Sequence, residues 1–135
     1  MRFTMMLISV LFLLVLAVGC SGNMKVSGKV TFSDGTPLTS GEVRFESSGF
    51  LASGKIQSDG NYTIGTIYES DGIPNGSYRV SIYALEYPDI PPDTDPADAP
   101  SPKSLVAEKF CSAETSGLTC EVNGTTKFDI TVEKP

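Results

Sequence analysis

The chain of 135 residues contains no histidine and no tryptophan. Histidine is the commonest general base and metal ligand in proteins, so the catalytic sites that depend on imidazole are excluded. After residue 19 there is no Gly-x-Ser-x-Gly or Ser-x-x-Lys pattern, and no Gly-rich phosphate-binding loop. Acidic residues fall in predicted turns or on outward strand faces, where carboxylates keep ordinary pKa values. We therefore predict that the protein is not an enzyme and uses no cofactor.

Basic residues are scarce. Lysine and arginine together number 10 against 16 acidic residues, which gives a formal net charge of −6. The basic residues are also single and widely spaced along the chain. A protein that binds a phosphate backbone needs clustered lysine and arginine, so a nucleic-acid partner is excluded.

Only one long apolar run is present, and it lies at the N-terminus. Arg2 precedes a stretch from Met5 to Val18 that is apolar apart from Ser9. This is the layout of an export signal, and the run falls short of the ~20 residues that a membrane-spanning helix needs. We predict that residues 1–19 are a signal peptide and that the protein is exported.

The end of this run resembles the processing site of a bacterial lipoprotein. Small and apolar residues at Ala17, Val18 and Gly19 lead directly to Cys20. In such proteins the signal is cut before the cysteine, and its thiol takes a diacylglyceryl group. Each buried methylene contributes ~0.8 kcal/mol, so two or three acyl chains hold a protein on a membrane. The alternative is an ordinary secretory signal cut near Gly19, with Cys20 unmodified.

The position after Cys20 bears on localisation. Ser21 stands there in place of an aspartate. By analogy with the sorting rule of better-known bacteria, this favours transfer to an outer membrane. We therefore expect a lipid-anchored protein of the cell envelope, tethered through residues 20–24.

Two cysteines remain after Cys20, at Cys111 and Cys120. An even pair in an exported chain favours a disulfide, which in the chain-entropy model would stabilise the fold by about 2 to 3 kcal/mol. The alternative is two independent buried thiols. Two cysteines without histidine cannot form a structural zinc site.

Beyond Met24 the chain consists of short alternating segments separated by Gly, Pro, Asn and Asp, which predicts an all-β domain over residues 25–135. Asp59-Gly60 and Asn123-Gly124 are predicted hairpin turns, each joining the segments on its two sides. The seven predicted strands are residues 25–32, 42–46, 54–58, 61–67, 77–83, 118–122 and 127–132.

This number of strands suggests a two-sheet sandwich, with a small barrel as the alternative. The predicted core is the set of inward-facing apolar residues of the alternating segments. Its members are Val30, Phe32, Val43, Phe45, Tyr62, Ile64, Val80, Ile82, Phe128 and Ile130.

Residues 86–103 are rich in proline and aspartate, and they predict a long exposed loop because they offer little to bury. Calcium binding is the alternative, since an external compartment supplies the ion. The repeated prolines and the lack of a glycine turn count against it. The candidate ligands would be Asp89, Asp93, Asp95 and Asp98.

Three segments together resemble the carboxypeptidase regulatory-like, transthyretin-related β-sandwich domains. Residues 26–45 hold a strand with a central glycine, a turn with a proline and a second strand, while residues 58–64 and 74–80 each carry a Gly-x-Tyr strand start. Residues 115–119 and 128–130 are similar to small lipoproteins of this type in planctomycete-like bacteria. The resemblance implies a non-catalytic accessory or interaction domain, and it carries over no functional residues.

These observations predict a lipid-anchored envelope domain that binds a protein or peptide partner or takes a structural part in an assembly. The alternative is a soluble secreted domain that binds a small ligand or calcium. Tyr78, Tyr83 and Tyr87 are candidates for an aromatic surface that binds glycan or peptide. Tyr78 is expected in the core instead, and the two remaining aromatic residues alone do not make a site.

Overall fold

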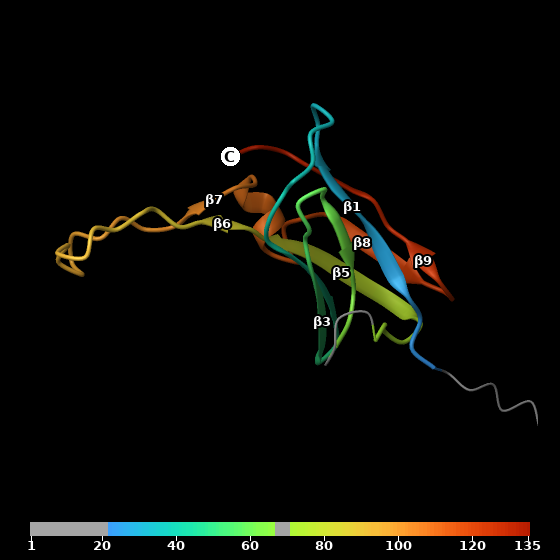
Figure 1. The fold of residues 1–135 in the computed structure, drawn as a ribbon. Helices are drawn as coiled ribbons and strands as arrows, with labels where there is room; N and C mark the ends of the chain where they lie inside the picture. The colour runs from blue at the N-terminus through green and yellow to red at the C-terminus, as the bar shows by residue number, and fades with distance from the viewer. Residues whose placement is uncertain (1–21, 67–70) are drawn as a thin grey trace, which may run out of the picture.

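The computed structural model describes residues 22–66 and 71–135, which form an all-β fold. Ten strands are described there, and the helical structure within these residues is a single 3-10 turn, η1 (Glu108–Cys111). Two main sheets make the body of the molecule, and a narrow arm projects from one end of it (Figure 1). No helix in the described part of the chain is long and apolar enough to cross a membrane.

The first sheet is built around β1 (Val26–Phe32). β4 (Asn61–Thr63) pairs with it in the antiparallel sense. β9 (Thr126–Lys127) and β10 (Ile130–Val132) pair with it in the parallel sense. The sheet is therefore mixed and brings the two ends of the domain together.

The second sheet is antiparallel throughout and has the order β3-β2-β5-β8. Its strands are β2 (Glu42–Ser47), β3 (Phe50–Lys55), β5 (Gly76–Tyr83) and β8 (Leu118–Val122). β2 sends Val43 and Phe45 inward while its charged residues face out, as the alternation in the sequence predicts.

The core lies between the two sheets. Phe45 of β2 packs edge-on against Phe128, which lies between β9 and β10, with ring centroids 6.2 Å apart. Phe45 also contacts Tyr78 of β5 at 6.1 Å. The predicted core residues are buried except for Phe32 and Phe128, which are half-buried and pack against the rest.

One predicted hairpin forms in part and the other is wrong. At Asp59-Gly60 the chain turns back on itself, because the Gln57 amide donates to the Asn61 carbonyl and Ser53 forms an antiparallel bridge with Gly65. The strands on either side nevertheless belong to different sheets, since β3 pairs with β2 and β4 pairs with β1. After Asn123-Gly124 the predicted hairpin is absent, because β8 pairs with β5 and the chain continues along the edge of β1.

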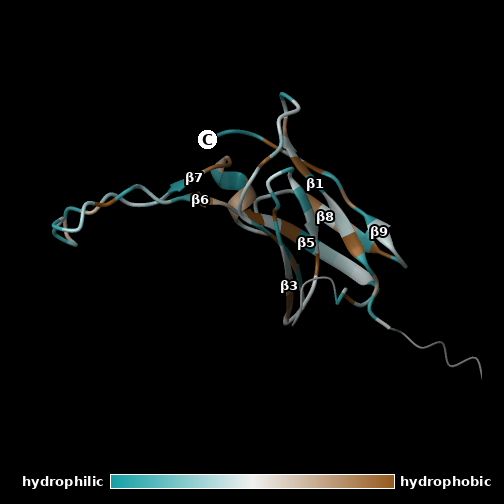
Figure 2. Ribbon diagram, viewed as in Figure 1, coloured by the Kyte–Doolittle hydropathy of each residue, from teal (hydrophilic) through white to brown (hydrophobic). Residues whose placement is uncertain are grey.

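Residues 86–103, for which the sequence predicts an exposed loop, lie in the arm and are mostly exposed. β6 (Leu85–Glu86) and β7 (Lys103–Ser104) pair at its base, and the rest extends away from the sheets (Figure 1). Figure 2 shows that hydrophobic residues concentrate on the strands of the body, whereas the arm is mostly pale or hydrophilic. The arm therefore contributes few residues to the hydrophobic core.

Candidate functional site

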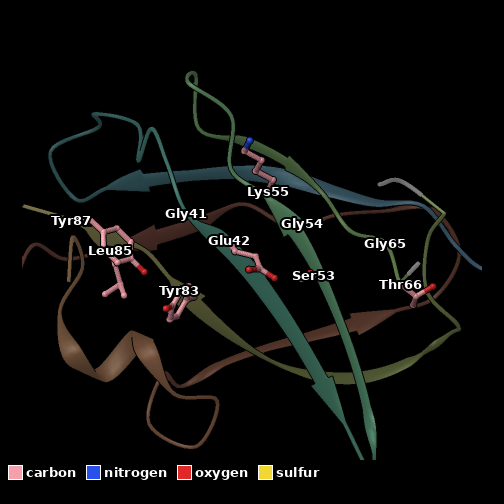
Figure 3. Close-up of a pocket in the computed structure, with 10 residues that line it drawn as sticks. All are labelled: Gly41, Glu42, Ser53, Gly54, Lys55, Gly65, Thr66, Tyr83, Leu85 and Tyr87. Carbon is pink, nitrogen blue, oxygen red and sulfur yellow. The ribbon is translucent and has the colours of Figure 1, made fainter. Parts of the chain in front are cut away.

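A cleft of about 500 Å³ opens beside β2 and β3, near the base of the arm. Small-molecule sites in proteins commonly measure ~300–1,000 Å³. Figure 3 shows its lining residues strung out along the sheet, from Tyr87 and Leu85 at one end to Thr66 at the other. The lining combines three glycines with polar, aromatic and aliphatic residues: Gly41, Gly54, Gly65, Glu42, Ser53, Lys55, Thr66, Tyr83, Leu85 and Tyr87.

Two tyrosines form one end of the cleft. Tyr83 ends β5 and is 42% exposed, and Tyr87 follows β6 and is 67% exposed. The neighbouring Tyr83 hydroxyl is the main reason that the pKa of Tyr87 is raised. We call Tyr83 and Tyr87 the tyrosine pair.

Arg44 supports the tyrosine pair from the neighbouring strand. Its guanidinium lies over the Tyr83 ring at 4.3 Å from the centroid, within the range of a cation–π contact. The same guanidinium lies 3.7 Å from the Glu42 carboxylate. These contacts hold the Tyr83 ring against Arg44 on one face, while the side chain stays 42% exposed.

The far wall of the cleft is closed by backbone pairing. Ser53 and Gly65 exchange two hydrogen bonds of 3.0 and 2.9 Å across the gap between β3 and the segment after β4. Close packing makes Gly54 necessary here, because a Cβ atom would lie 2.3 Å from the Thr63 carbonyl oxygen. The Thr66 hydroxyl donates to Asp71 at 2.7 Å, which orients it at this end.

The cleft is thus equipped for binding by stacking and hydrogen bonding. It offers one carboxylate at Glu42, one ammonium at Lys55, two aliphatic hydroxyls and two phenols. Carboxylates accept hydrogen bonds and ammonium groups donate them, so the cleft can form both kinds of hydrogen bond with a ligand.

The predicted lipidation site lies outside the described residues. Ala17, Val18, Gly19 and Cys20 belong to residues 1–21. The structure describes the chain from Gly22, and Met24 forms a bridge to Ile73 just before β1.

The predicted bridge between Cys111 and Cys120 is not formed, since both are free thiols in the structure. Cys120 is buried in β8 at 3% exposure, and this burial raises the pKa of its thiol. Cys111 is exposed at the end of η1, with its sulfur 3.5 Å from the Ser104 hydroxyl. The fold sends one thiol into the core and leaves the other at the surface.

The four candidate calcium ligands lie along the arm at Asp89, Asp93, Asp95 and Asp98. Within the described ranges, no three His, Cys, Asp or Glu side chains are placed to hold a metal ion. Asp95 instead accepts a hydrogen bond of 2.9 Å from the Ala97 amide within a local turn. The structure does not gather these carboxylates around a common point.

The sequence drew attention to Tyr83 and Tyr87 as aromatic candidates without treating them as a site, and it missed the rest of the cleft. Tyr83, Leu85 and Tyr87 alternate, and this period of two is a visible signal of a shared strand face. Glu42 and Lys55 carry no such signal, because their proximity depends on the pairing of β2 with β3.

No family model matches the chain, and no curated protein matches it either. One similar solved structure is that of a DUF3823 family protein from Bacteroides ovatus ATCC 8483, with a TM-score of 0.48 and 19% sequence identity. The match covers 83% of this chain and 45% of that chain, so this chain spans less than half of that protein.

Proposed function

We propose that this protein is an exported lipoprotein of the cell envelope and that its sandwich is a non-catalytic binding domain. The observation that carries the proposal is the cleft of about 500 Å³ with the exposed tyrosine pair at one end. Its lining has the mixture of aromatic and polar groups that ligand sites use for affinity and orientation.

The arrangement of the domain supports the anchored form of this proposal. The described chain starts at the end of the sandwich opposite to the arm (Figure 1). The tyrosine pair lies at the base of the arm, at the end of β5. With acyl chains on Cys20, the tyrosine pair and the arm would point away from the membrane, where a ligand can reach them.

The anchor is tested by intact mass spectrometry of the protein purified from membranes of a bacterial host. The expected mass is that of residues 20–135 with acyl groups on Cys20, and Cys20→Ser should move the protein to the soluble fraction. Gly22→Ala serves as the matched control and should stay in the membrane. A mature chain without lipid would overturn the anchor and favour a secreted binding domain.

A further inference from the structure

We propose that the cleft binds a neutral oligosaccharide, which deepens the proposed function and rests on it. The tyrosine pair offers ring faces at one end, and polar side chains continue along the cleft to Thr66 (Figure 3). An elongated site of this kind suits a linear ligand that presents an apolar face to the rings and hydroxyl groups to the rest.

The rings match the apolar face of a sugar. The C–H groups on one side of a pyranose are weakly positive, and the face of a tyrosine ring is negative, so the two attract. Arg44 covers only one side of the Tyr83 ring. Tyr87 is the more exposed of the pair, and the contact with Arg44 orders the Tyr83 ring before a ligand arrives. The pair therefore presents two exposed rings for stacking.

The charges in the cleft favour a neutral ligand. Glu42 brings a negative charge and Lys55 a positive one, so the lining has no excess of either sign. A carboxylate and an ammonium group together can accept from one sugar hydroxyl and donate to the next. An acidic glycan would be repelled by the Glu42 carboxylate and by the net charge of −6 on the whole chain.

The backbone argues against an extended peptide in the same cleft. A peptide that adds to a sheet needs unpaired backbone groups on an edge strand. At the middle of the cleft the outward groups of Ser53 in β3 are already bonded to Gly65. Leu85 is the one aliphatic side chain in the lining, so pockets for apolar side chains are also few.

The test is affinity electrophoresis of the membrane-purified protein in gels that contain a neutral polysaccharide. Four probes are used: a soluble β-glucan, an α-glucan, an arabinoxylan and a galactomannan. The detergent must have no sugar headgroup, because such a headgroup would compete for the cleft. An extended proline-rich peptide serves as the probe for the alternative ligand.

The key variant is Tyr87→Ala, whose side chain is too exposed to matter for folding. It should raise the apparent dissociation constant for the bound polysaccharide, obtained from the retardation, about tenfold, because one stacking surface is lost. Tyr87→Phe keeps the ring and should bind within about twofold of the wild type. Ile90→Ala, a truncation at an exposed arm residue outside the cleft, is the matched control and should behave like the wild type.

The outcomes separate this inference from the proposed function. Retardation by at least one polysaccharide that Tyr87→Ala weakens about tenfold, and that Tyr87→Phe and Ile90→Ala leave nearly unchanged, would support the saccharide site. Lack of retardation by all four, equal retardation of the wild type and Tyr87→Ala, or retention of the peptide alone would overturn it. The mass of the same preparation shows whether Cys20 carries lipid. Missing lipid would contradict the anchor without affecting the saccharide site, and missing sugar binding would contradict the saccharide site without affecting the anchor.

Discussion

Tyr62 shows at the scale of one residue how a buried polar group is accommodated. Its side chain is 2% exposed, and its hydroxyl donates to the Phe128 carbonyl of the segment that runs beside β1. Burial raises the pKa of this phenol above its ordinary value of 10.0, with smaller contributions from Cys120 and Asp129. One hydroxyl thus ties β4 to the end of the chain.

We predict that Tyr62→Phe lowers the free energy of unfolding at neutral pH by about 1 kcal/mol, through loss of this hydrogen bond. Above pH ~10 the unfolded state releases the phenolic proton and the folded state keeps it, so the wild type loses stability as pH rises. The variant lacks that loss, and the two stabilities should converge. Denaturant titrations from pH 7 to pH 11 measure this, and a gap that stays constant would contradict it.

The two thiols should differ sharply in reactivity. Cys111 is exposed and Cys120 is buried with a raised pKa, which keeps it protonated and shielded. A chromogenic thiol reagent should therefore modify Cys111 in the native protein and Cys120 only after denaturation. Cys111→Ser should abolish the native reaction, with Cys120→Ala as the comparison. A two-dalton gain on reduction would show instead that a bridge forms.

At the scale of a strand, the position of Gly28 leaves no room for a side chain. It lies in the middle of β1, in register with Tyr62 of β4. A Cβ atom at this position would lie 1.9 Å from the Phe128 carbonyl oxygen and 2.9 Å from the Tyr62 hydroxyl. The parallel pairing that brings the end of the chain against β1 therefore requires a residue without a side chain.

We predict that Gly28→Ala destabilises the domain by about 3 kcal/mol, since backbone atoms cannot move aside as a side chain can. Thermal and denaturant unfolding measure the effect. Gly22→Ala is the matched control, because nothing lies within 4 Å of a Cβ there. Equal stability of both variants would show that the chain end is not packed against β1 in this way.

The whole molecule consists of a packed sandwich and an arm that it carries. The apolar residues of the core lie in the sandwich and at the base of the arm, whereas Tyr87 and Ile90 on the arm are exposed. β6 and β7 close the arm where it leaves the body. Stability should therefore depend on the sandwich and not on the arm.

We predict that replacing residues 88–101 by Asn-Gly leaves the melting temperature within about 3 °C of the wild type, because the removed residues bury little and closing a shorter loop costs less entropy. Tyr87 is retained, so binding to the cleft should also persist. Differential scanning calorimetry measures the first effect. A fall of 10 °C or more would show that the arm packs on the body.

Local patterns in the sequence predicted much of this fold. Alternation in residues 25–32, 42–46 and 77–83 identified β1, β2 and β5, each with an error of one residue at one end. The third predicted strand was displaced, because β3 starts at Phe50, ahead of residues 54–58. The run Phe50–Lys55 has weak alternation, and its pairing with β2 determines its structure.

The sequence by itself determined the all-β class, the inward-facing residues and the exposed arm, because these follow from the spacing of apolar residues along the chain. Tertiary structure alone decided that β3 and β4 belong to different sheets, that β1 pairs with the end of the chain, and that Glu42, Lys55 and Tyr83 share a cleft. Strand pairing joins residues that are distant in the sequence, so it depends on which faces bury best together and leaves no periodic signal at either partner.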